Sequence, residues 1–397
     1  MNREMKILKQ GHEKRPTLGF SLGHYLRSLD WILLGATLAL ATFGMLMIYS
    51  ATHADTNIST PYYYVRSQAV GLIIGLVVLV GLSINNYQWF RRYQRYIYAL
   101  VLGLLVVTLF IGTVRNGSKR WIDLGIFDLQ TSELAKFLLI VSFAALLAEG
   151  VELRHRFRFV IVAVVYIMVP AAFIFTQPDL GTAIILIMIL LIMLVVWGIR
   201  LPHLGILAGA GVLVSVFALR VLPGAFGVHL LKGYQLTRLT EFLNPSPNPS
   251  GAGYQLYQSK IAIGSGMFSG KGYLKGTQTH LNFLPAHHTD FIFSVIGEEL
   301  GFLGCMLLLV LFGLVAWRAF RIARMSRDLY GTLIASGVAG VMIFQVFLNV
   351  GMTIGILPVT GVPLPFVSFG SASLIVFLMA IGLLESIHVH SVAAEPK

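Results

Sequence analysis

Long apolar runs separated by short polar segments repeat along nearly the whole chain, from Trp31 to Ile387. Each run has roughly 20 residues, which is the length that an α-helix needs to cross a hydrocarbon core about 30 Å thick. The pattern predicts an all-α polytopic integral membrane protein with about ten transmembrane helices. The predicted spans cover residues 30–50, 68–86, 96–114, 132–149, 159–176, 180–199, 203–221, 291–317, 330–353 and 370–387.

One long polar stretch, residues 222–290, interrupts this pattern between the seventh and eighth spans. We interpret it as a large loop of the membrane domain, which itself covers residues 30–387, with polar tails at 1–29 and 388–397. Glycines are frequent within 264–276, and a glycine-rich backbone can approach a sugar or a phosphate closely. The loop is therefore a candidate for function beyond spanning the bilayer.

Composition agrees with a membrane protein and excludes an ordinary soluble domain. The chain has 397 residues, of which 56% are hydrophobic and only 12% are charged, whereas soluble domains carry about 25% charged residues. The formal net charge is +12, but the basic residues lie mostly in short loops, as they do on the cytoplasmic side of membranes, so nucleic acid is not the expected partner. The single cysteine, Cys305, excludes an intramolecular disulfide.

The distribution of lysine and arginine sets the expected orientation. Both termini are predicted to be cytoplasmic and the 222–290 loop extracytoplasmic. The residues that define the cytoplasmic side are Arg91, Arg92, Arg95, Arg154, Arg156, Arg158, Arg200, Arg318, Arg321, Arg324 and Arg327.

Some basic residues fall on the predicted outer side instead. Arg115, Lys119 and Arg120 cluster in the short loop between spans three and four, and Arg238 and Lys271 lie in the long loop. Long loops cross the membrane largely regardless of charge. The short-loop cluster predicts a site for an external anionic ligand, and the alternative is that these residues snorkel to the interface.

Ionisable residues inside predicted spans need a partner or a cavity, because each costs on the order of 2.5–3.5 kcal/mol at the centre of the membrane. Glu133 and Lys136 are three residues apart, so they share one face of a helix and can pair. Asp179 precedes an apolar helix and is placed to cap it. Glu298 and Glu299 lie two turns into the eighth span, so at least one is expected to face protein or water.

Asp290 stands where the polar loop gives way to the eighth span. A helix N-terminus would favour its ionised form and partial desolvation would raise its pKa, a mixture that suits a general base. Capping of the helix is the structural alternative. The adjacent His287 and His288 point apart and lack the spacing of a metal site, so no His-ligated metal is predicted.

Several ordered motifs are spread over the chain from Arg115 to the last span. They include Arg115-Asn116-Gly117-Ser118-Lys119-Arg120-Trp121, Ser132-Glu133-Leu134-Ala135-Lys136, Gln177-Pro178-Asp179, Gly253-Tyr254-Gln255, His288-Thr289-Asp290-Phe291, Glu298-Glu299-Leu300-Gly301 and the loop from Pro358 to Ser368. Together they resemble the bacterial shape, elongation, division and sporulation (SEDS) family, which commonly has proline at the position of Thr131. Within the family, the segments 270–272 and 276–278 are most similar to members that act in cell elongation.

The resemblance implies a peptidoglycan glycosyltransferase in the bacterial inner membrane that polymerises the lipid-linked precursor lipid II on the outer face. It also implies a complex with a class B penicillin-binding protein, the transpeptidase that crosslinks the strands. Asp290 matches the family position regarded as catalytic. Trp121, Glu133 and Lys136 match positions associated with activity.

The residues suit such a reaction on chemical grounds. Inverting transfer of a sugar from a pyrophosphate leaving group needs one general base and positive charge near the phosphates, not the paired carboxylates of a hydrolase. Asp290 is the candidate base, and the candidate phosphate-binding residues come from Arg115, Lys119, Arg120, Arg238 and Lys271. A divalent cation (Mg²⁺ or Mn²⁺) is compatible with this chemistry, but no ligand set in the sequence requires one.

Two other function classes remain open at this level. The first is a flippase or transporter of the same lipid, which intramembrane charges would suit, although the two halves show no internal repeat. The second is a non-catalytic membrane scaffold of the elongation or division machinery, which would explain the loops but not an acid among cationic residues.

Overall fold

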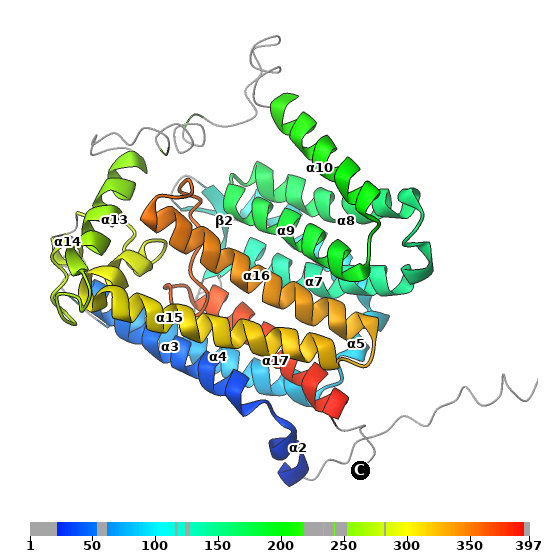
Figure 1. Ribbon diagram of the computed structural model, residues 1–397, viewed down its shortest axis with the longest axis horizontal. Helices are drawn as coiled ribbons and strands as arrows, with labels where there is room; N and C mark the ends of the chain where they lie inside the picture. Colours follow the sequence, from blue (N-terminus) through cyan, green and yellow to red (C-terminus); the bar gives the residue numbers. More distant parts are fainter. Residues whose placement is uncertain are drawn as a thin grey trace, which may run out of the picture.

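The architecture is a bundle of long helices, and the predicted fold class is confirmed (Figure 1). The structure, a computed structural model, describes residues 22–53, 62–115, 118–123, 128–217, 233, 242, 252–281 and 283–392. Within these residues, nine helices are long and apolar enough to cross a membrane. They are α3 (Trp31–Thr52), α4 (Tyr63–Ile84), α6 (Gln94–Ile111), α7 (Thr131–Glu149), α8 (Phe157–Thr176), α9 (Leu180–Trp197), α15 (Ile292–Met325), α16 (Leu329–Ile354) and α17 (Ser371–Val392).

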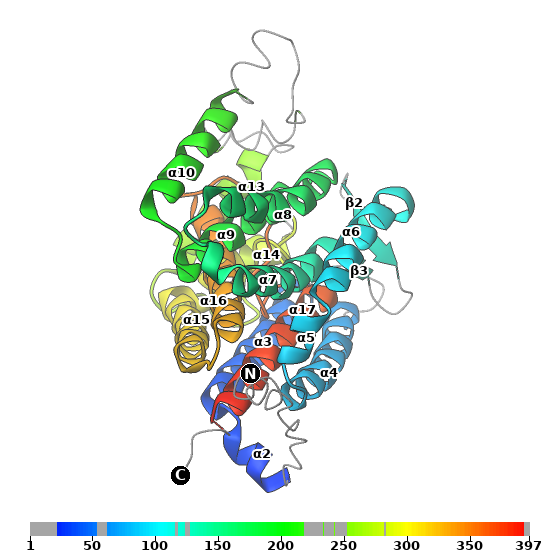
Figure 2. The same ribbon diagram turned by 90° about the vertical axis from the view of Figure 1, so that its right-hand side faces the viewer.

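The predicted seventh span, residues 203–221, coincides with a shorter helix, α10 (Leu201–Val216). This helix lies apart from the others (Figures 1 and 2), and nearly all of its apolar side chains are exposed. Three other boundaries differ from the prediction by five residues or more: α4 begins five residues before 68, α15 continues eight residues beyond 317 and α17 five residues beyond 387. A short helix, α2 (Leu22–Ser28), lies within the segment predicted as the N-terminal tail.

Residues at the helix ends explain where several spans begin and end. Asp30, Asp179 and Asp328 are the N-caps of α3, α9 and α16, and each side chain accepts a hydrogen bond from a main-chain amide of the first turn. Gly198 and Gly355 follow α9 and α16 in the left-handed conformation, which terminates a helix at low cost only for glycine.

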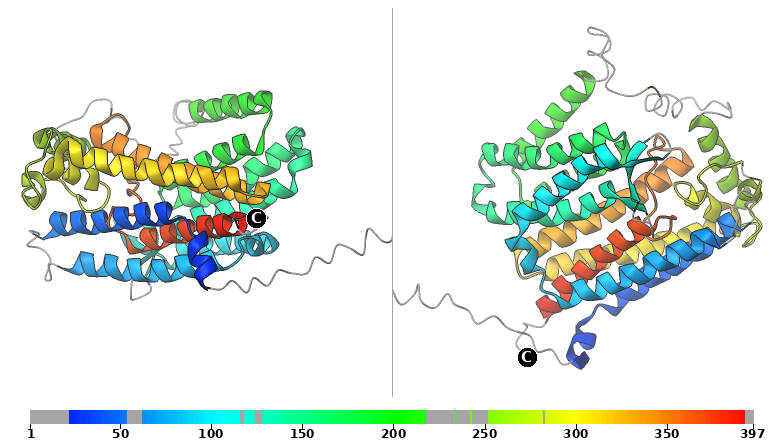
Figure 3. Two further views of the ribbon diagram at one scale, coloured as in Figure 1. Left: turned by 60° about the horizontal axis from the view of Figure 1, so that its bottom comes forward. Right: turned by 180° about the vertical axis from the view of Figure 1, so that it is seen from behind.

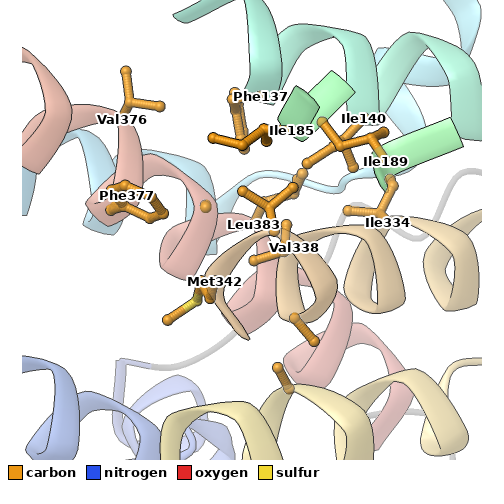
Figure 4. Packing of buried hydrophobic residues seen from close by; sticks show 14 of the residues in the cluster. Phe137, Ile140, Ile185, Ile189, Ile334, Val338, Met342, Val376, Phe377 and Leu383 are labelled. Carbon is orange, nitrogen blue, oxygen red and sulfur yellow. The ribbon is translucent and has the colours of Figure 1, made fainter. Parts of the chain in front are cut away.

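The buried core lies where α7, α9, α16 and α17 meet. Figure 4 shows Phe137, Ile189, Val338 and Phe377 converging from these four helices. Because α7, α16 and α17 are buried on most sides, their sequences are apolar all round rather than amphipathic. The longest helix, α15, runs beside α3 and α16 (Figure 3) and reaches from one end of the bundle to the other.

A small antiparallel sheet covers one end of the bundle. Its strands, in the order β1 (Thr113–Arg115), β2 (Ser118–Asp123) and β3 (Asp128–Gln130), occupy the short loop between α6 and α7. Strand β2 contacts α6 and α7 (Figure 2), and β3 contacts α17. This sheet was not predicted, because three-residue strands carry little periodicity.

The described part of the long loop is largely ordered against α15. It contains α13 (Ala252–Gly266) and α14 (Thr277–His280). A side chain at Gly266 would meet the carbonyl oxygen of Gly297 at 1.8 Å, and one at Gly270 would meet that of Glu299 at 2.1 Å. The close backbone approach that these glycines allow is therefore to α15, which is itself kinked at Gly301 (φ 62°).

Candidate functional site

Asp290 lies in a turn, residues 285–291, immediately before α15, and its side chain is half-buried. The helix begins at Ile292 with Phe291 at the N-cap position. Three consecutive main-chain carbonyls of this turn, those of residues 288, 289 and 290, each accept a hydrogen bond from another segment. In that order, the donors are the Phe369 amide at 2.9 Å, the Ser368 hydroxyl at 2.6 Å and the Asn349 side-chain amide at 2.9 Å.

Further contacts fix the same turn. Ala286 adopts a left-handed conformation (φ 54°) that is strained for a residue with a side chain. The ring of His288 lies 4.6 Å from that of Tyr64, which in turn packs 4.8 Å from Phe369. The turn before Asp290 is therefore tied to α4, α16 and the 357–369 loop, and the position of the carboxylate is determined by elements far apart in the sequence.

Asn349 belongs to a polar stripe on α16 that reaches the predicted intramembrane pair. Gln345, one turn earlier, accepts a hydrogen bond from the Lys136 ammonium at 3.3 Å. Lys136 also pairs with Glu133 at 2.7 Å, which confirms the pairing expected from their spacing. Asn349 donates a second hydrogen bond, 2.8 Å long, to the Val362 carbonyl. One face of α16 thus links the Glu133–Lys136 pair to the loop that holds Asp290.

The Glu133–Lys136 pair is almost completely buried, and its charges are satisfied within the bundle. Ser373 on α17 donates to the second oxygen of Glu133 at 3.2 Å. Beside the pair lies a cavity of about 20 Å³, lined otherwise by apolar residues of α7, α16 and α17. That volume admits about one water molecule, so the pair does not itself line a space large enough for a sugar.

Asp179 caps α9, as predicted, and also anchors the β1–β3 sheet through Arg120. One oxygen accepts the Thr182 amide at 3.1 Å, and the other pairs with Arg120 of β2 at 3.3 Å. Burial by itself would raise the pKa of Asp179, but the Arg120 charge and hydrogen bonds from Thr182 and Ser132 outweigh it and hold that pKa below its ordinary value. Arg120 therefore has a carboxylate partner within the protein.

Glu298 and Glu299 are fully buried and face the 270–278 segment. Glu298 accepts the Lys271 ammonium at 2.6 Å and the Thr277 amide at 2.9 Å. Glu299 accepts the Leu274 amide at 3.3 Å. These two acids stabilise the path of the loop across α15. Lys271 contributes to that path through its ion pair with Glu298.

The predicted site residues thus fall into separate groups. Asp290 is connected with Glu133 and Lys136 through α16, whereas Arg120 and half-buried Trp121 lie on β2 and Lys271 lies beside Glu298. Arg115 and Lys119 occupy β1 and β2, but their side chains are outside the described part, as is the whole of Arg238. Substrate binding by the basic residues stays a prediction.

Three residues that hold the Asp290 turn or its neighbourhood were not predicted: Gln345, Asn349 and Ser368. A signal for the first two is present in the sequence, because two amides four residues apart in an otherwise apolar span share one helical face. Among the described residues, no group of three His, Cys, Asp or Glu side chains is arranged to hold a metal ion.

Comparison with known proteins gives extensive matches. The family model FtsW/RodA/SpoVE, described as "Cell cycle protein", matches residues 30–393. Peptidoglycan glycosyltransferase MrdB of Escherichia coli K12 is 38% identical over 366 residues, which are 91% of this chain and 94% of that protein. Stage V sporulation protein E of Bacillus subtilis strain 168 is 36% identical over 369 residues, covering 92% of this chain and 98% of that protein.

Solved structures agree with these matches. A chain in a structure described as "Structural coordination of polymerization and crosslinking by a peptidoglycan synthase complex" is 30% identical, with a TM-score of 0.75 and coverage of 91% of this chain and 98% of that one. The rod shape determining protein RodA of Thermus thermophilus is 27% identical, with a TM-score of 0.65 and coverage of 91% and 96%. The chain is a multi-pass membrane protein that belongs to the FtsW/RodA/SpoVE family, the SEDS family indicated by its motifs.

Proposed function

We propose that this protein is a peptidoglycan glycosyltransferase that polymerises lipid II into glycan strands on the outer face of the bacterial inner membrane. Family membership and relatives named as peptidoglycan glycosyltransferases support this activity. The observation that carries the residue assignment is the Asp290 turn, whose main chain accepts three hydrogen bonds from α16 and the 357–369 loop while its side chain stays half-buried at a helix end.

In the proposed reaction, Asp290 accepts the proton of the C4 hydroxyl of the acceptor sugar. The hydroxyl oxygen attacks the anomeric carbon of the donor, and the bond to the polyprenyl pyrophosphate breaks with inversion. The leaving group takes the bonding electrons, so positive charge nearby lowers the barrier. A half-buried carboxylate held by its own main chain can change protonation state without losing its position, which general base catalysis requires.

The basic residues of the outer side differ in what they can still offer to phosphates. Arg120 and Lys271 each already have a carboxylate partner. In this proposal they add positive potential and hold the sheet and the loop, and a phosphate oxygen would share their remaining donors. A divalent cation, if bound, would be held by the Asp290 carboxylate and would supply positive charge for the leaving group; no step above is routed through it.

The proposal includes a class B penicillin-binding protein as the working partner and a role in cell elongation. The structural neighbour from a peptidoglycan synthase complex supports the first. The role in elongation rests on the similarity of the 270–278 sequence to that of family members that act in elongation. We further propose that both termini are cytoplasmic and that Asp290 faces outward, on the strength of the lysine and arginine distribution.

The decisive experiment is glycan polymerisation from purified lipid II, comparing the parent protein with Asp290→Asn, each with and without its penicillin-binding protein. We expect strands from the parent and a loss of at least about 100-fold in the variant, the size of a general base contribution. Retained synthesis by a folded Asp290→Asn protein would refute the assignment of the base.

The same preparation separates the rival functions. No strands from the parent with a verified partner, together with movement of lipid II across vesicle membranes, would favour the flippase. Neither activity would favour the scaffold.

A further inference from the structure

A second group of polar residues lies at the opposite end of the bundle from Asp290. There the connection between α7 and α8, which contains the 3-10 turn η1 (Val151–Leu153), meets the link between α9 and α10. The Trp197 indole donates to the Leu147 carbonyl at 2.7 Å and ties the ends of α7 and α9 together. Gly198, at φ 88°, then turns the chain so that Arg200 lies beside His155.

The side chains at this junction present more hydrogen-bond donors than acceptors. The Arg200 Nε–H points at Nδ1 of His155 at 2.9 Å, and the Arg154 Nε–H points at Nε2 of the same ring at 3.4 Å. A neutral imidazole has only one acceptor nitrogen, and a charged one has none. His155 can therefore satisfy at most one of the two guanidinium groups that surround it.

Arg154, His155 and Arg200 are exposed, and the two guanidinium groups are open to a ligand from outside. None of the four ion pairs found among the described residues includes Arg154 or Arg200. Desolvation and the charges of Arg200 and Arg154 lower the pKa of His155, so the two guanidinium groups that face the ring disfavour a third positive charge there. Nδ1 of His203, in the first turn of α10, is buried and without a hydrogen-bond partner within this part of the structure.

We propose that Arg154, His155, Arg200 and His203 form a binding site for a phosphate oxyanion, supplied by the headgroup of an anionic phospholipid. Guanidinium groups match the geometry of phosphate oxygens, and the terminal N–H groups of both arginines can donate to one anion that lies across the His155 ring. The site lies at the ends of membrane-spanning helices, where headgroups lie.

A lipid fits this site better than free phosphate because apolar surface continues from it. Leu201 is 80% exposed and Ile206 is 53% exposed on the adjoining turns of α10. A phosphate held by the arginines would place acyl chains along these side chains. The site serves no step of the glycosyl transfer proposed at Asp290, so it adds a lipid-binding function at the other end of the molecule.

The test uses the full-length protein in nanodiscs of phosphatidylcholine mixed with phosphatidylglycerol, with retained lipids counted by native mass spectrometry. We expect the parent to retain phosphatidylglycerol in preference to phosphatidylcholine. Arg154→Gln/Arg200→Gln should lose this preference by about fivefold per arginine. The matched control, Arg156→Gln/Arg158→Gln, removes the same charge from the same surface segment without touching a residue of the site, and should keep the preference.

Inorganic phosphate added to the protein in uncharged detergent provides the second arm. Displacement of retained phosphatidylglycerol by phosphate, in the parent but not in the double variant, supports an oxyanion site. Phosphate binding without any preference for phosphatidylglycerol would show that the site takes free phosphate and would refute the proposal of a lipid headgroup. An equal loss in the control variant would show general surface electrostatics instead. Unchanged retention in the double variant, with a parental thermal unfolding midpoint, would overturn the site.

Discussion

The start of helix α15 and the turn that precedes it carry acidic residues in two settings that differ in how the protein holds them. At Glu298 and Glu299 the carboxylates are fully buried and accept hydrogen bonds from the 271–278 segment. At Asp290, two turns earlier, the side chain is half-buried, and the hydrogen bonds from α16 and the 357–369 loop go to the main chain of its turn. The charges of Glu298 and Glu299 therefore stabilise the fold. The contacts around Asp290 instead fix the position of an acid that stays close to the surface.

The contrast shows why sequence position alone does not assign a role to an acid. All three acids lie within ten residues, and each was a plausible functional group. Buried charges are tolerated only when paired, and a fully paired acid is poorly suited to exchange protons.

The largest expected effect is a contrast between Glu298, whose loss should lower stability, and Asp290, whose loss should abolish activity. Glu298→Ala leaves the Lys271 ammonium and the Thr277 amide without their acceptor, and we expect it to lower the free energy of unfolding by about 3–5 kcal/mol. Asp290→Asn should leave stability within about 0.5 kcal/mol of the parent while abolishing polymerisation. Thermal unfolding in detergent, run beside the lipid II assay, measures both. Equal destabilisation by the two changes would remove the distinction.

The second prediction concerns the buried pair of α7. Lys136→Met leaves Glu133 charged and unpaired within the core, at an expected cost of about 3 kcal/mol in stability. Adding Glu133→Gln removes that charge, so the double variant should be more stable than the single one. A double-mutant cycle in unfolding midpoints checks this, and a double variant less stable than Lys136→Met would contradict it.

The third prediction asks whether the clamp on the Asp290 turn matters for catalysis. Asn349→Leu removes the donor to the Asp290 carbonyl. We expect kcat to fall by about 10-fold to 100-fold with a smaller change in KM, because small displacements of a catalytic group are costly. Thr353→Val, one turn further along the same helix, is the matched control, since its hydroxyl bonds only within α16. A kcat that falls as much in the control would argue for a general effect of helix packing.

The smallest expected effect is a pH dependence at the β1–β3 sheet. The lowered pKa of Asp179 contributes stability that is fully present above its ordinary value of 3.8 and is lost as the pH falls through the lower folded value. Arg120→Gln removes the charge that pairs with Asp179, so the variant should lose about 1 kcal/mol at neutral pH and show a weaker decline in acid. Unfolding midpoints from about pH 6 to pH 2 test this. An unchanged acid decline would contradict the role of Arg120.

Much of the fold follows from local properties of the chain. Apolar length predicted the spans, and aspartates and glycines at the helix ends account for several of their boundaries. The Glu133–Lys136 pair was also accessible from sequence, because helical periodicity alone places i and i+3 on one face. Apolar length does not fix how far a helix continues past the membrane, and for that reason the end of α15 at Met325 was missed.

The sequence by itself determined a polytopic helical membrane protein, its family and an acid at the start of the eighth span. Only the tertiary structure decided that Glu298 and Glu299 bind the 271–278 segment and which segments hold the Asp290 turn. Asn349 and Ser368 reach that turn from 59 and 79 residues away. Such contacts depend on how the helices pack, and packing depends on side chains from several helices at once, whereas spans and caps depend on residues that are neighbours in the chain.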